Sequence, residues 1–136
     1  MGVLNVQRMS WTRQAYRAML WHIVERMRAE SAHVLFISDL CTPAWMTARA
    51  GTLLLAIDEF TLIIRGEVGI CLSRFMLERW KECGSETFSV DGSLRWIGIS
   101  VKIRSQKYHL VGHYSPTQSG GNADGPRQAH FEYGSQ

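Results

Sequence analysis

Three polar residues of this sequence stand at or near the ends of apolar stretches, where the side chains of a sheet reach its edge. Asn5 follows Val3 and Leu4, Asp39 follows the apolar run at 33–38, and Tyr114 ends the run that starts at Leu110. Asp39 carries a carboxylate, the oxygen ligand that a hard cation such as Mg²⁺ requires. Each residue also has an ordinary structural interpretation: a turn residue, a carboxylate that caps a turn, and a core-edge tyrosine. Residue type alone leaves both interpretations open.

Other chemically capable side chains are less informative. His109 and His113 are four residues apart and would share one face of a strand, but without a third ligand a zinc site is not expected. The tryptophans are scattered, which favours core or edge positions over a base-stacking platform. Cysteine occurs three times at wide spacing, at Cys41, Cys71 and Cys83, which argues against a disulfide framework and for a reducing compartment.

The first forty residues alternate strand and helix patterns. Residues 3–6 predict a short strand, and Thr12 is a plausible N-cap for a helix that runs to about Glu30. Residues 33–38 are almost continuously apolar, which is typical of a strand covered on both faces. Strand, helix and strand in this order predict a βαβ-like opening.

From residue 52 the pattern becomes one of consecutive strands. One or two helical turns are expected at 75–82, and Asp91-Gly92 is a strong hairpin signal. Residues 118–126 read as loop, and 127–133 have weak helical character that ends without burying anything. The strands are predicted at 52–57, 60–65, 68–73, 86–90, 95–103 and 107–114.

Four short motifs follow one another in the sequence: Leu4-Asn5-Val6, the stretch 34–39, Arg65-Gly66-Glu67-Val68-Gly69-Ile70, and Tyr114 with Pro116 and Thr117. In this order they resemble the first half of the endonuclease/exonuclease/phosphatase family, in the form carried by non-LTR retrotransposons. The resemblance covers roughly residues 3–117. It implies an α/β fold, the N-terminal half of a four-layer α/β sandwich with two stacked, mainly antiparallel sheets flanked by helices. Residues 1–117 would be the partial domain, and 118–136 a polar, truncated tail.

The resemblance also implies roles for the three polar residues. Asn5 and Tyr114 would be catalytic-site residues: Asn5 would help to orient the phosphate or a metal-ligand carboxylate, and Tyr114 would face the scissile phosphate of DNA. Asp39 would be the Mg²⁺ ligand. The family has a glutamate at that position, so the carboxylate here is one methylene shorter. The family's Gly-Asp-x-Asn strand and later Asp-His pair do not occur in these 136 residues. We therefore expect a fragment of a DNA-nicking phosphodiesterase that is inactive in isolation. The alternative is a non-catalytic remnant or a small interaction domain.

Charge and hydropathy add broad limits. The net charge of +3 suits a polyanionic partner without identifying one. The longest apolar run, 53–57, is far shorter than the ~20 residues that a membrane span needs, so no membrane partner is expected. The expected location is intracellular, in the nucleus or the cytoplasm. If half of the sandwich is missing, the strand at Leu110–Tyr114 should have an uncovered face and edge and favour self-association.

Overall fold

The computed structural model describes residues 2–5, 13–40, 52–89, 95–115 and 128–135. They form two helices and two sheets. In chain order the elements are β1 (Gly2–Asn5), α1 (Arg13–Ala29), β2 (Val34–Ser38), β3 (Leu53–Ile57), β4 (Phe60–Arg65), β5 (Val68–Leu72), α3 (Arg74–Glu82), β6 (Thr87–Phe88), β7 (Trp96–Ile103), β8 (Gln106–Ser115) and β9 (Gln128–Ser135).

The first sheet, sheet A, has five strands in the order β1-β2-β5-β4-β3. β1 and β2 are parallel and are joined through α1, whereas the other neighbours are antiparallel. All five residues of β2 are buried, as expected for a strand that is covered on both faces. Met19, Ile23 and Met27 of α1 pack in one apolar cluster with Leu35 and Ile37 of β2, so α1 covers one face of this sheet.

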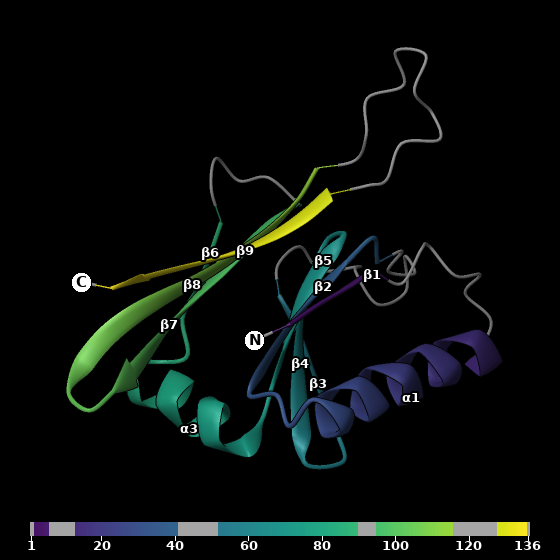
Figure 1. The fold of residues 1–136 in the computed structure, drawn as a ribbon, viewed down its shortest axis with the longest axis horizontal. Helices are drawn as coiled ribbons and strands as arrows, with labels where there is room; N and C mark the ends of the chain where they lie inside the picture. The colour runs from purple at the N-terminus through teal and green to yellow at the C-terminus, as the bar shows by residue number, and fades with distance from the viewer. Residues whose placement is uncertain (1, 6–12, 41–51, 90–94, 116–127, 136) are drawn as a thin grey trace.

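The second sheet, sheet B, is antiparallel throughout, with the order β6-β7-β8-β9. It stacks on the face of sheet A opposite α1, and the two sheets share an apolar core to which α3 contributes Met76 and Trp80 (Figure 1). The sheets come close together at Gly112 of β8. A Cβ atom built there would lie 2.1 Å from Cδ2 of Phe36 in β2. The absence of a side chain at Gly112 therefore lets the buried Phe36 ring press against the β8 backbone.

Local sequence explains the start of α3. Ser73 is the N-cap, and its hydroxyl accepts a hydrogen bond from the Met76 backbone N–H at 3.2 Å. The same hydroxyl lies 2.8 Å from Nδ1 of His33, the residue just before β2. One serine thus begins the helix and ties it to sheet A.

The predicted α/β class with two stacked, mainly antiparallel sheets is confirmed, as are the parallel βαβ opening, the long helix and the expected strands between 52 and 114. The Thr12 cap and the Asp91-Gly92 turn lie outside the described residues.

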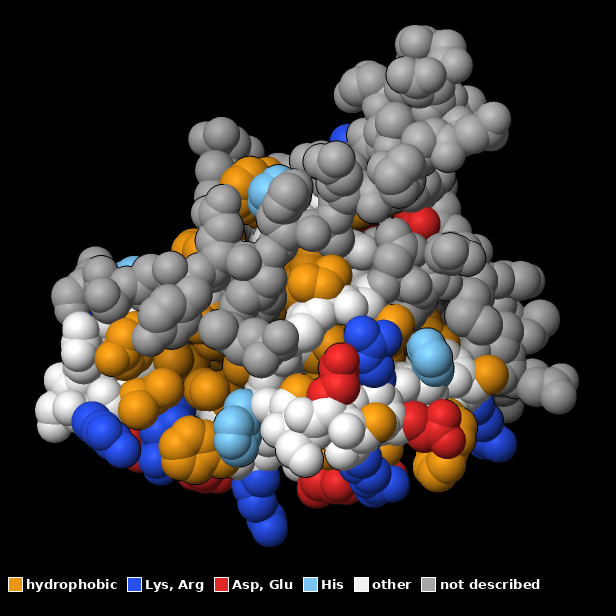
Figure 2. Space-filling view, viewed as in Figure 1, with side chains coloured by type: hydrophobic (Ala, Val, Ile, Leu, Met, Phe, Trp, Pro, Cys, Tyr) orange, Lys and Arg blue, Asp and Glu red, His pale blue; other side chains and the backbone are white. Residues whose placement is uncertain are grey.

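Figure 2 shows charged side chains of both signs along the lower rim of the molecule, near α1 and α3. Among the described residues, no helix is long and apolar enough to cross a membrane.

Two expectations about the C-terminal part are wrong. Residues 128–135 form a strand and not a helix, because β9 pairs with β8 along the register Tyr108↔Ser135 to Ser115↔Gln128. β8 therefore lies between two strands and has no open edge. Its inward residues Leu110 and Tyr114 are only 1% and 2% exposed, so the uncovered apolar face predicted there is also absent.

Candidate functional site

Asn5 and Asp39 come from the carboxyl ends of two parallel strands. In the β1–β2 register Asn5 lies opposite Ser38, the residue before Asp39. Asp39 is 2% exposed and has a φ of 61°, in the left-handed region where Asp is tolerated better than most side chains. The chain therefore turns sharply at Asp39, directly beyond the end of β2. The register therefore places Asn5 and Asp39 at the same end of sheet A.

A chain of short contacts links this end of sheet A to sheet B. The backbone N–H of Leu40 donates to the carbonyl of Glu67 at 2.8 Å. The Glu67 carboxylate accepts a hydrogen bond from Nε of Arg95 at 3.0 Å. The carbonyl of Arg95 in turn accepts from the backbone N–H of Tyr114 at 2.9 Å. We call Asp39, Glu67, Arg95 and Tyr114 the sandwich-end cluster, because these contacts gather them at one end of the stacked sheets.

Tyr114 faces inward at this end. Its side chain belongs to the core between the sheets, which also contains Phe36 and Val68. The structure thus brings two of the three predicted site residues, Asp39 and Tyr114, to the same end of the sandwich. Asn5 reaches the same end through its backbone.

Ser38 adds a polar group beside these residues. Its hydroxyl is fully buried and has no hydrogen-bond partner among the described residues. A buried hydroxyl left without a partner costs about 1–3 kcal/mol, so such groups are uncommon and mark positions where another polar atom can bind. Because Ser38 is the register partner of Asn5 and directly precedes Asp39, this position adjoins the sandwich-end cluster.

The donor chemistry of the cluster bears on the expected Mg²⁺. Asp39 has the hard oxygen donor that this ion prefers. The carboxylate of Glu67, however, is held by Arg95, whose positive charge competes with a cation. Within the described ranges, no group of three or more His, Cys, Asp and Glu residues could hold a metal ion. These residues do not by themselves build a magnesium site.

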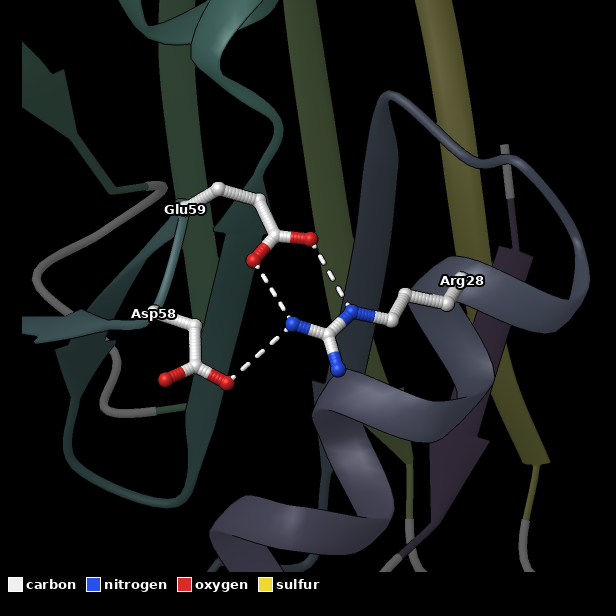
Figure 3. A network of polar contacts seen from close by, with 3 residues as sticks. All are labelled: Arg28, Asp58 and Glu59. Atoms are coloured by element: carbon white, nitrogen blue, oxygen red, sulfur yellow. Dashed lines mark hydrogen bonds and ion pairs between the residues drawn. The ribbon is translucent and has the colours of Figure 1, made fainter.

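A network of charged groups lies at the other end of sheet A. Arg28, near the end of α1, bonds both carboxylate oxygens of Glu59, at 3.0 and 2.8 Å, and reaches Asp58 at 3.2 Å (Figure 3). The hydrogen bonds from Arg28 lower the pKa of Glu59 to about 2. Asp58 and Glu59 form the turn between β3 and β4, so this network fastens α1 to sheet A. Its carboxylates are engaged by one arginine, which indicates a structural role.

His109 and His113 do share one face of β8. Nδ1 of His109 lies 2.8 Å from the hydroxyl of Ser100, and the His113 ring stacks on Trp96. Neither histidine belongs to the inward-facing core in which Tyr114 lies.

Sequence reasoning missed Glu67 and Arg95 as members of the site. Glu67 stands where the Arg-Gly-Gly-Val-Gly-Ile strand start of the resembled family has a glycine, and this departure was the available signal. Arg95 had no signal, because its partner is 28 residues away in the chain. No family model, curated protein or solved structure matches this chain, so its function must be argued from its own residues.

Proposed function

We propose that this chain carries the phosphate-facing end of a metal-dependent phosphodiesterase, of the type that nicks DNA in non-LTR retrotransposons. The observation that carries the proposal is the convergence of Asp39 and Tyr114, from separate sheets, through the Leu40–Glu67–Arg95–Tyr114 hydrogen bonds. Acidic and phenolic groups at one end of two stacked sheets suit an anionic phosphodiester that approaches with a bound cation. Asn5 and Tyr114 are the proposed phosphate-facing residues, and Asp39 is the proposed Mg²⁺ ligand.

These 136 residues are proposed to be inactive by themselves. Phosphodiester hydrolysis needs a group that activates the attacking water, and the Gly-Asp-x-Asn and Asp-His pairs that do this in the resembled family do not occur in the sequence. Asp39 would then act only together with residues outside this sequence. The proposal therefore assigns this chain a share of a site and not a complete catalytic centre.

The test begins with the reading frame in its native transcript. If the frame continues through a Gly-Asp-x-Asn strand and an Asp-His pair, the longer protein should nick supercoiled plasmid DNA in the presence of Mg²⁺. Asp39→Ala should then abolish nicking, whereas Asp58→Ala, a carboxylate change at the opposite end of sheet A, should leave it intact. Unimpaired nicking by a folded Asp39→Ala protein would refute the assignment of Asp39.

The second candidate is a non-catalytic scaffold or interaction domain. The ion pair between Glu67 and Arg95 favours it, because a side chain that neutralises a carboxylate at the site removes a potential cation ligand. This candidate predicts that the longer protein, if one exists, has no Mg²⁺-dependent nicking activity even with wild-type Asp39. Self-association belongs to this candidate as well, and sedimentation velocity of residues 1–136 would measure it.

A further inference from the structure

The face of sheet B that points away from sheet A has an unusual composition. Paired residues of an antiparallel ladder share a face, and Ile97, Ile99 and Leu110 point inward into the core. The alternate positions of β7 and β8 therefore form the outer face. Its pairs are Trp96 with His113, Gly98 with Val111, Ser100 with His109, and Lys102 with Lys107.

Four ring side chains lie against the β7–β8 ladder. Trp96 and His113 stack with their ring centroids 4.3 Å apart and their planes 15° from parallel. Phe88 of β6 covers Gly98, where a Cβ atom would lie 2.3 Å from the ring. The His109 ring then meets Phe88 edge-on at 5.7 Å, and Ser100 holds His109 through the 2.8 Å contact to its Nδ1. The rings form a row along the strands, and Trp96, Phe88, His109 and His113 are all partly exposed.

Positive charge lies at one end of this row. Lys102 and Lys107 are directly opposite each other and exposed, an arrangement that repulsion between like charges disfavours. Arg104 lies in the turn between them with a φ of 52°, in the left-handed region that glycine or asparagine usually fills in such a turn. No Asp or Glu occurs between Gly92 and Ala123. The register brings one carboxylate residue, Glu132 of β9, opposite Val111. An anion bound between the lysines would relieve their repulsion.

The two described helices do not cover this face. α1 packs on sheet A, and α3 contributes Met76 and Trp80 to the core between the sheets. Figure 1 shows both helices on the far side of sheet B from its outer face. The row of rings is therefore a surface feature of the described molecule and not part of a second core.

We propose that this outer face, the Trp96–Phe88–His109 ring row with Lys102 and Lys107, binds single-stranded nucleic acid. Bases stack on the flat rings and phosphates pair with the lysines. The tryptophans are predicted at core or edge positions, and Trp96, the first residue of β7, stacks with His113 on the outer face of sheet B. Single strands fit better than a duplex, because an unpaired base presents its face to a side-chain ring and a base stacked in a duplex does not. The proposal does not depend on the phosphodiesterase assignment, since Asp39 and Tyr114 are not on this face.

Fluorescence anisotropy of residues 1–136 with a fluorescein-labelled oligothymidylate of about 15 nucleotides tests the proposal, because a site of this size fits one sheet. We expect binding that is tighter than to a duplex of equal length and that weakens as salt rises. Trp96→Ala should weaken binding about tenfold, the loss typical of one stacked base. The matched control is Trp21→Ala, because Trp21 is an exposed tryptophan of α1 and lies on the other side of the molecule. This variant should bind as the wild type does.

A second set of variants changes only the charged side chains and leaves the packing of the rings unaltered. Lys102→Gln with Lys107→Gln should make the slope of log affinity against log salt shallower by about 1.4, because each phosphate contact of a single strand contributes about 0.7. Arg74→Gln with Lys81→Gln removes the same charge from exposed positions of α3 and should leave the slope within about 0.3 of the wild type. If both double variants changed the salt dependence equally, binding would depend on net charge alone, and the proposal would be overturned. It would also be overturned by equal affinity for duplex, by no binding at low salt, or by a dimer in sedimentation velocity that Trp96→Ala dissociates.

Discussion

Gly112 of β8 packs against the Phe36 ring of β2 where the two sheets stack. The substitution Gly112→Ala tests this contact directly. The added methyl group would lie 2.1 Å from Cδ2 and 2.4 Å from Cε2 of the Phe36 ring. Carbon atoms in good contact are about 3.5–4.0 Å apart, so ring and backbone would have to separate by about 1.4 Å. Phe36 is fully buried, and its ring therefore has no solvent-facing space into which to move.

Overpacking a well-filled core costs typically about 1–3 kcal/mol. We expect Gly112→Ala to lower the free energy of unfolding by ~3 kcal/mol, because the overlap involves several ring atoms and a backbone that is paired on both sides. For a chain of this size, that loss corresponds to a decrease in Tm of about 10 °C. Equilibrium unfolding in urea, followed by circular dichroism, measures the free energy of unfolding.

Gly98→Ala is the matched control. A methyl group there would lie 2.3 Å from the Phe88 ring, a similar overlap, but Phe88 is half-exposed and can swing toward solvent. We expect a loss of ~1 kcal/mol or less. Phe36→Leu should partly rescue Gly112→Ala. The double variant should lose about 1–2 kcal/mol less free energy of unfolding than the two single variants lose together. If Gly112→Ala lowers the free energy of unfolding no more than Gly98→Ala does, and shows no coupling with Phe36→Leu, then β8 does not pack against Phe36 of β2 at Gly112.

Three further predictions concern individual side chains. The pKa of Glu59 is lowered from 4.5 to about 2 by the hydrogen bonds from Arg28, so the stability it contributes is present above pH 4.5 and is lost as the pH falls toward 2. Acid titration of stability should therefore show wild type and Glu59→Gln converging below pH 4.5, and a constant gap between them would contradict the ion pair. Burial raises the pKa of the Cys71 thiol to about 12, so in a Cys41→Ser background an aromatic disulfide reagent at pH 8 should modify Cys83 rapidly and Cys71 only after unfolding. Rapid modification in a Cys83→Ser variant of that background would show that Cys71 is accessible. Ser73→Ala should cost about 1–2 kcal/mol in urea unfolding, because it removes the N-cap of α3, whereas Ser73→Asn should retain most of the cap; equal losses in the two variants would exclude a capping role.

Much of the architecture follows from local pattern in the sequence. The apolar run at 33–38 predicts a doubly covered strand, and all five residues of β2 are buried. The spacing of apolar residues in the first helix predicts its inward face, and Met19, Ile23 and Met27 lie in the core. Asn5, Asp39 and Tyr114 are singled out by short motifs that resemble those of the endonuclease/exonuclease/phosphatase family, and such motifs are local in the sequence.

Features that depend on partners distant in the chain could not be predicted. Residues 128–135 have little strand signal of their own and become a strand because β8 offers a ladder for pairing, which outweighs weak local preference. The ion pair of Glu67 with Arg95 and the stack of Trp96 on His113 likewise join residues that only the sheet register makes neighbours. Sequence by itself thus determined most of the strand and helix segments, but not β9, since backbone preference and apolar periodicity are local. The tertiary structure alone decided which side chains meet at the sandwich end and on the outer face of sheet B, because those meetings depend on long-range pairing and on the close approach of the two sheets at Gly112.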